Sequence, residues 1–457
     1  MKKYSAKFWI FFVFLSALFL FGWFVFWEVR HQGLSRLLPF LKVAPMKEET
    51  RTDMETLLLV ADNVLRTDGK ERVFLLLFQN NLELRPGGGF IGSFGILKVR
   101  DGSVTEFAVH DTGNFDGRIP STVTPPYPMK ETLGIDSWKL RDSNYAPDFY
   151  ENVAMAERFY LMGNGTEKFD GVIALTTNVL TSFLRVVGPV TLEGFPGTYG
   201  ADNAIIDLEY QVEQGYRSQN IAFGDRKSVM GVLGLKVLEE MKKVSLTKKY
   251  ELFQALLADL HGKDIQLFFH DEYLQAYIKN AHWDGAVDTT WKNDYLFAVD
   301  ANLNSFKSDY FVKRSYDYVV DFSQEKPQAK LSITYEHTAK ARDWFTKEYQ
   351  TFLRVYVPEG SYAHKITGNT KEPVYGEAFG KKYFGTLVQV PLNSEKTVTF
   401  EYSLPQNIEQ QWYDLKIQKQ PGLSDTPVTV TIIKKDGSKE KNHFALDRDR
   451  IWSGFDE

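Results

Sequence analysis

Residues 94–109, with the sequence FGILKVRDGSVTEFAV, decide the fold class of this 457-residue chain. The apolar runs 94–99 and 104–109 flank Asp101 and Gly102, a residue pair that tolerates the left-handed backbone of a tight hairpin turn. The short apolar run 73–78 precedes the hairpin and supplies a further strand. The stretch therefore predicts an antiparallel sheet early in the chain.

Helical periodicity surrounds these strands. In residues 48–68 apolar side chains recur at three-and-four spacing, which predicts an amphipathic helix. Further helices are expected at 148–161, 177–186, 202–215, 226–243 and 248–260, with a strand at 171–175. Strands and helices mixed in this way predict an α/β (α+β) domain over residues 71–305.

After this domain the pattern changes to short alternating runs separated by turn residues. The runs are 316–322, 330–335, 352–357, 386–390, 397–402 and 428–433. Alternation of period two is typical of strands that bury one face. We therefore expect a β-sandwich domain over 306–435, followed by a C-terminal segment over 436–457.

The N-terminus predicts a membrane anchor. Residues 8–27 contain no charge, and a helix of that length spans about 30 Å of hydrocarbon. Three lysines precede it, so 1–7 is expected to be a cytoplasmic stub, with a juxtamembrane and amphipathic segment over 28–70. A cleaved signal peptide is the alternative, but the apolar run is too long and no small-residue cleavage site follows it. We expect a single-pass cell-membrane protein with an extracytoplasmic ectodomain.

Composition narrows the ligand classes. Lys and Arg total 54 against 59 Asp and Glu, a net charge of -5, which argues against nucleic acid as a partner. Residues 1–27 hold three lysines and no acid, so the rest of the chain carries -8. Cysteine is absent, which excludes disulfides, thiolate zinc sites and a cysteine nucleophile. Any phosphate ligand must therefore be bound by a few local cations.

Four basic residues are candidates for that role. Arg85 precedes a glycine turn at 87–89, where backbone amides beside a guanidinium form an anion nest. Arg217, Arg226 and Lys227 lie before or at the start of the helix 226–243, whose dipole favours an anion. The glycines also match the dinucleotide pattern G-x-G-x-x-G, but a strand follows them. A structural turn that lets two strands approach closely is the competing interpretation.

Two carboxylates are candidate metal ligands. Asp111 ends the second hairpin strand, where side chains project into loops that often carry sites. Asp225 precedes the two cations of the helix start. Both are expected to hold magnesium together with phosphate oxygens, or to orient the arginines; a cap at a strand or helix end is the structural alternative. The eight histidines lack the i, i+4 spacing of a helical metal site, so a zinc enzyme is not expected.

Several segments together resemble the bacterial domain of unknown function 4012 family. They are QNNLELRPGGGFIG at 79–92, RDSNYAPDF at 141–149, FDGVIA at 169–174, GPV at 188–190, WDG at 283–285, Asn302 with KSD at 307–309, and FLRVYVP at 352–358. The resemblance implies a membrane-anchored, surface-facing bacterial protein whose biochemical activity is not established.

A more distant similarity is to the LytR-CpsA-Psr cell-envelope proteins. It rests on the strand 104–112 ending in His-Asp-Thr, on the segment 170–190, and on Arg217 with Gly-Asp-Arg at 224–226. The resemblance implies an N-in enzyme that transfers glycopolymers from polyprenyl-pyrophosphate carriers to the cell wall, with arginines and magnesium on the pyrophosphate. Three positions depart from that pattern. They are His110 in place of arginine, the Arg85 turn in place of Arg-Ser-Asp, and Lys227-Ser228 in place of Arg-Gln.

We therefore expect an envelope protein with a LytR-CpsA-Psr-like domain that binds a lipid phosphate or a cell-wall glycopolymer. Arg85, Arg217, Arg226 and Lys227 would contact phosphate, and Asp111 and Asp225 would serve any phosphotransfer step. The alternative is a non-catalytic surface module that binds or adheres through its β-sandwich. Paired carboxylates of a glycoside hydrolase cannot be singled out by spacing.

Overall fold

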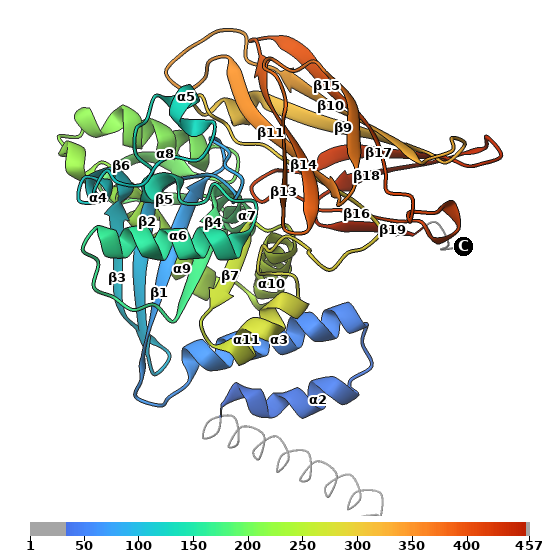
Figure 1. Ribbon diagram of the computed structural model, residues 1–457. Helices are drawn as coiled ribbons and strands as arrows, with labels where there is room; N and C mark the ends of the chain where they lie inside the picture. The colour runs from blue at the N-terminus through green and yellow to red at the C-terminus, as the bar shows by residue number, and fades with distance from the viewer. Residues whose placement is uncertain (1–32, 454–457) are drawn as a thin grey trace, which may run out of the picture.

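The computed structural model describes residues 33–453 and shows a mixed α+β fold in two parts (Figure 1). The predicted stub 1–7 and transmembrane helix 8–27 lie outside the described residues. Within the described range, no helix is both long and apolar enough to span a bilayer. The predicted mixture of helices and sheets is confirmed.

The first part is built on a five-stranded sheet with the order β3-β2-β1-β4-β7. Its strands are β1 (Glu71–Asn80), β2 (Phe90–Arg100), β3 (Ser103–Asp111), β4 (Gly171–Thr176) and β7 (Ile265–Phe269). β1 and β4 are parallel, and the other pairs are antiparallel. The predicted hairpin is confirmed, because β2 and β3 pair across Asp101 and Gly102, both of which have positive φ.

Both faces of this sheet are covered because alternate residues of β1 point to opposite sides. Leu75 and Leu77 pack with α6 (Phe149–Met162) on one face. Phe74 and Leu76 pack on the other face with α3 (Glu48–Leu65), α7 (Thr177–Val187), α10 (Leu246–His261) and α11 (Glu272–Asn280). The remaining elements of this part are η1 (Leu34–Leu37), α2 (Leu38–Val43), α4 (Thr112–Asp116), α5 (Met129–Leu133), η2 (Leu140–Asp142), β5 (Val190–Leu192), β6 (Phe195–Tyr199), α8 (Ala204–Glu213), η3 (Gly215–Arg217), η4 (Phe223–Asp225) and α9 (Ser228–Lys243).

The second part is a pair of six-stranded sheets. One has the order β12-β15-β10-β9-β17-β18 and the other β13-β14-β11-β8-β16-β19. A short helix, η5 (Ser308–Phe311), precedes β9, and η6 (Gln410–Trp412) precedes β16. The strands are β8 (Asp294–Val299), β9 (Val312–Asp321), β10 (Gln328–His337), β11 (Tyr349–Pro358), β12 (Tyr362–Thr367), β13 (Val374–Ala378), β14 (Lys381–Val390), β15 (Ser394–Ser403), β16 (Asp414–Ile417), β17 (Thr426–Ile433), β18 (Lys439–Leu446) and β19 (Arg450–Ser453).

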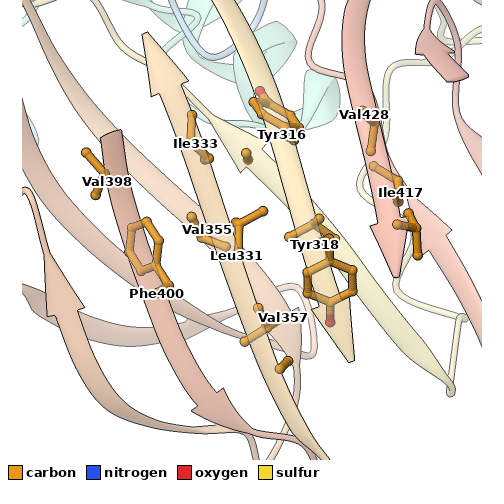
Figure 2. Close-up of a cluster of buried hydrophobic side chains, with 14 of the residues drawn as sticks. Tyr316, Tyr318, Leu331, Ile333, Val355, Val357, Val398, Phe400, Ile417 and Val428 are labelled. Atoms are coloured by element: carbon orange, nitrogen blue, oxygen red, sulfur yellow. The ribbon is translucent and has the colours of Figure 1, made fainter. Parts of the chain in front are cut away.

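The two sheets share one apolar core. Figure 2 shows Leu331 and Phe400 of the first sheet beside Val355 and Val357 of the second. Each of these side chains is at most 1% exposed. Alternate residues of the strands supply this core, as expected for a sandwich.

The predicted domain limits cut through these sheets and need correction. β8, which the prediction assigned to the α/β domain, lies between β11 and β16. β18 and β19 belong to the sheets as edge strands, although the prediction placed them in a separate C-terminal segment. All six residues of β8 are buried, so its sequence lacks the alternation that marks a half-exposed strand.

The two parts meet at the glycine turn that follows β1. The backbone amide of Asn302 donates to Leu84 O at 2.9 Å, and Gln420 Nε2 donates to Arg85 O at 3.1 Å. Gly88 has φ of +131°, and a Cβ there would lie 1.9 Å from Gln79 Oε1. A Cβ on Gly422 would lie 2.0 Å from Gly88 O. Glycine is required at 422 because its backbone touches that of Gly88, and at 88 because φ is positive and the Gln79 side chain lies close.

Candidate functional site

Arg85 lies at the domain junction and is only 1% exposed. Its guanidinium forms ion pairs with Glu83 at 2.9 Å and Asp142 at 3.0 Å, and it donates to Asn302 O at 2.5 Å. The two carboxylates and the carbonyl oxygen accept hydrogen bonds from the guanidinium N–H groups of Arg85. These donors are therefore not available to a phosphate. The structure thus places Arg85 in a neutralised buried network, and the glycine turn serves the close approach of backbones.

Asp111 lies at the end of β3, where the chain turns into α4. Its Oδ1 accepts from the backbone amide of Asn114 at 3.0 Å, which caps α4. Its Oδ2 lies 2.8 Å from Lys227 Nζ and 3.9 Å from Arg226 NH2. Asp111 therefore brings together two predicted phosphate ligands that lie more than a hundred residues later in the sequence.

Arg226 and Lys227 come from the turn between η4 and α9. Lys227 is the residue immediately before the helix, and it also donates to the carbonyl oxygen of Gly92 on β2. The Arg226 guanidinium lies over the Phe223 ring, 4.1 Å from its centroid. Arg226 Nε is buried and has no hydrogen-bond partner among the described residues. One carboxylate thus faces two cations, and one buried donor is left over; we call Asp111, Arg226 and Lys227 the cation cluster.

Electrostatics within the cation cluster favour an added anion. Burial raises the pKa of Asp111, but the hydrogen bond and charge of Lys227 outweigh burial and hold that pKa below its ordinary value. Burial lowers the pKa of Lys227. The hydrogen bond and the charge of Asp111 raise it and so offset part of this effect. A phosphate beside Lys227 would stabilise the charged ammonium in the same way as Asp111 does.

Arg217 and Asp225 lie outside this cluster. Arg217 is exposed, and its Nε donates to the Tyr216 hydroxyl at 3.1 Å. Tyr216 in turn contacts the Phe223 ring, 6.1 Å between centroids, so two aromatic rings separate Arg217 from Arg226. Asp225 ends η4, is exposed, and forms no ion pair with a described residue. The predicted helix start at 226 is also shifted, because α9 begins at Ser228.

Protein groups already engage Asp111, one of the two carboxylates that the sequence predicts as magnesium ligands. Among the described residues, no group of three or more His, Asp or Glu side chains is placed to share a metal. Both oxygens of Asp111 are in use, one by the Asn114 amide and the other by Lys227. The ammonium of Lys227 stands where a cation bound to this carboxylate would be.

His110 precedes Asp111 on β3 but lies outside the cation cluster. His110 stacks on Phe94, 5.0 Å between ring centroids, and points to the opposite face of the sheet from Asp111. Burial and the positive charge of Arg118 lower the pKa of His110, which favours its neutral form. No sequence motif marks Arg118, whose position near His110 depends on the path of the chain through α4 after β3.

Together, the fold and the site define a two-part α+β chain with a small cation cluster at a sheet edge. Residues 69–212 match the family model described as "Protein of unknown function (DUF4012)". This match confirms the predicted family for that segment, which contains β1 to β4 and Asp111. No curated protein is similar enough to count as a relative.

Solved structures show only weak likeness. The Lin1025 protein of Listeria innocua is 14% identical over 47% of this chain and 79% of its own, with a TM-score of 0.28. A putative nutrient binding protein of Legionella pneumophila is 9% identical over 35% of this chain and 66% of its own, with a TM-score of 0.22. An M1 zinc metallopeptidase of Deinococcus radiodurans is 9% identical over 30% of this chain and 40% of its own, with a TM-score of 0.16. At these scores the likeness carries no argument about function.

Proposed function

We propose that this chain is a membrane-anchored envelope protein that binds a phosphate group of a lipid or glycopolymer at the cation cluster. The observation that carries the proposal is the excess of partly buried positive charge in the cation cluster. Arg226 and Lys227 share a single carboxylate, and Arg226 Nε has no described partner. Partly buried cations with spare donors bind phosphate through charge-assisted hydrogen bonds.

The cellular setting of the proposal comes from the sequence. The uncharged stretch 8–27, with lysines before it, supports a single-pass anchor with the ectodomain outside the cytoplasm. The finer fold assignment, a LytR-CpsA-Psr-like domain, is supported by the order of a strand ending at Asp111 and a later Gly-Asp-Arg turn at 224–226. A phosphotransferase activity is the extension of this proposal, because the same cations would stabilise charge on a transferred phosphoryl group.

Isothermal titration calorimetry with farnesyl pyrophosphate tests the binding site. The full chain is used in detergent with EDTA, so that the protein's own cations are measured. We expect Arg226→Ala and Lys227→Ala each to weaken binding about tenfold or more, because each removes a charge-assisted hydrogen bond worth roughly 1.5–3 kcal/mol. Lys236→Ala on the same helix is the control, since Lys236 already pairs with two glutamates.

Unchanged affinity in both cluster variants would contradict the proposal. It would leave the alternative, a surface module that acts through the β-sandwich. Arg85→Ala is not a useful probe of phosphate binding, because this arginine stabilises the domain junction.

A further inference from the structure

An exposed aromatic surface lies where α8 meets the loop between β10 and β11. The helix and both strands are labelled in Figure 1. Tyr210 of α8 and Trp344 of the loop are in edge-to-face contact, 6.1 Å between centroids. Tyr210 is 49% exposed and Trp344 40%. Large aromatic side chains at this exposure are more typical of binding surfaces than of a fold's interior.

The Trp344 loop is held rigidly. Asp343 Oδ1 accepts from the backbone amides of Phe345 at 2.9 Å and Thr346 at 2.8 Å, which fixes a tight turn. Trp344 packs against Phe345, which is buried. A preformed aromatic side chain loses little conformational entropy when a ligand binds, which favours affinity.

Two cations, Arg342 and Lys347, lie in the same loop as Trp344. The Phe306 ring lies under Lys347 Nζ at 4.5 Å and under the Arg342 guanidinium at 5.9 Å. Neither cation forms an ion pair within the described residues, and Glu348 and Glu83 act on the pKa of Lys347 only through their charge, which raises it. On a chain of net negative charge, this combination is complementary to a ligand that has both flat apolar faces and anionic groups.

The surface is also connected to the cation cluster through α8. Lys307 pairs with Glu209 at 3.6 Å and Glu213 at 3.7 Å, and its backbone amide donates to Phe345 O at 3.0 Å. Glu213, one turn beyond Tyr210, raises the pKa of Lys227 by its charge. The same short helix thus carries an aromatic residue of the exposed surface and an acid within electrostatic reach of the cation cluster.

We propose that Tyr210, Trp344, Arg342 and Lys347 form a binding site for an anionic glycan chain. Sugar rings present flat C–H faces that pack on aromatic rings, while acidic groups along the chain would pair with the two cations. The site joins the α/β part to the β-sandwich, so both parts contact one polymer. This inference rests on the proposed function, because it identifies the polymer whose phosphate would reach the cation cluster.

Calorimetric titration of the full chain with two anionic glycans, phosphodextran and hyaluronate, tests the inference. Inorganic polyphosphate supplies charge without sugar, and unmodified dextran supplies sugar without charge. We expect Trp344→Ala and Tyr210→Ala to weaken binding of at least one anionic glycan about tenfold, as for loss of an aromatic anchor. Trp412→Ala is the matched control, because Trp412 is 70% exposed at another place in the sandwich.

The inference is overturned if neither anionic glycan binds, if Trp344→Ala binds them as tightly as the unsubstituted chain, or if polyphosphate binds equally well without dependence on Trp344. The farnesyl pyrophosphate titration separates this failure from failure of the proposed function. That probe carries no sugar, so its binding should depend on Arg226 and Lys227 and be unchanged in Trp344→Ala.

Discussion

Arg85 lies in a sequence motif that is typical of anion binding, but in the structure its guanidinium stabilises the fold. The Arg-Pro-Gly-Gly-Gly string is compatible with an anion nest, but the acids that neutralise Arg85 include Asp142, which lies 57 residues further along the chain. That distance is not visible in local spacing. Asp111, Arg226 and Lys227 were identified from the sequence because they end or begin elements, where side chains gather.

Replacement of Arg85 should therefore reduce the free energy of unfolding. Arg85→Ala leaves Glu83 and Asp142 buried without their cation, and we expect a loss of roughly 3–5 kcal/mol in the free energy of unfolding. Urea denaturation followed by circular dichroism measures this. Arg100→Ala is the comparison, because its ion pair with Glu71 is exposed and should contribute about 1 kcal/mol or less. Equal losses in the two variants would refute the buried network.

At the scale of elements, most helices and strands could be predicted because their periodicity is local. The hairpin β2–β3 follows from the turn pair, and α3, α6, α7 and α10 follow from apolar spacing. β8 and β18 were not predicted as strands, for opposite reasons. β8 is buried on both faces and β18 is largely exposed, so neither shows the alternation of a half-buried strand.

The glycine turn between β1 and β2 should not tolerate a larger residue at Gly88. Gly88→Ala places a Cβ at φ of +131° and within 1.9 Å of Gln79 Oε1, so we expect destabilisation of at least about 2 kcal/mol. Gly437→Ala is the matched control, because it also has positive φ but nothing lies within 4 Å. It should cost only about 1 kcal/mol. Thermal unfolding compares the two, and a Gly88→Ala melting temperature at or above that of Gly437→Ala would contradict the crowding of Gly88 against the Gln79 side chain.

At the scale of the whole molecule, residues before the predicted boundary at 305/306 supply a strand and a buried acid to the β-sandwich. Arg314 is buried in the sandwich, and its Nε pairs at 2.8 Å with Asp300, which lies before that boundary. β8 supplies the middle of one sheet from the same side of the boundary. Sequence patterns define elements but not which sheet each element joins, because sheet order depends on contacts distant in the chain.

A fragment of residues 306–435 should therefore fail to fold. It lacks β8, β18 and β19, and it leaves the Arg314 guanidinium without Asp300. We expect no near-ultraviolet circular dichroism signal and no sigmoidal urea transition, with the full chain as the positive control. A cooperative transition in this fragment would show that the sandwich is independent of the preceding residues.

The central claim is that Arg226 and Lys227 bind phosphate beside Asp111. A crystal structure of the full chain with methylene diphosphonate, a pyrophosphate analogue that resists hydrolysis, tests this most directly. We predict diphosphonate oxygens about 2.7–3.1 Å from Lys227 Nζ and Arg226 Nε. A diphosphonate bound elsewhere, with Arg226 Nε still unpartnered, would contradict the account.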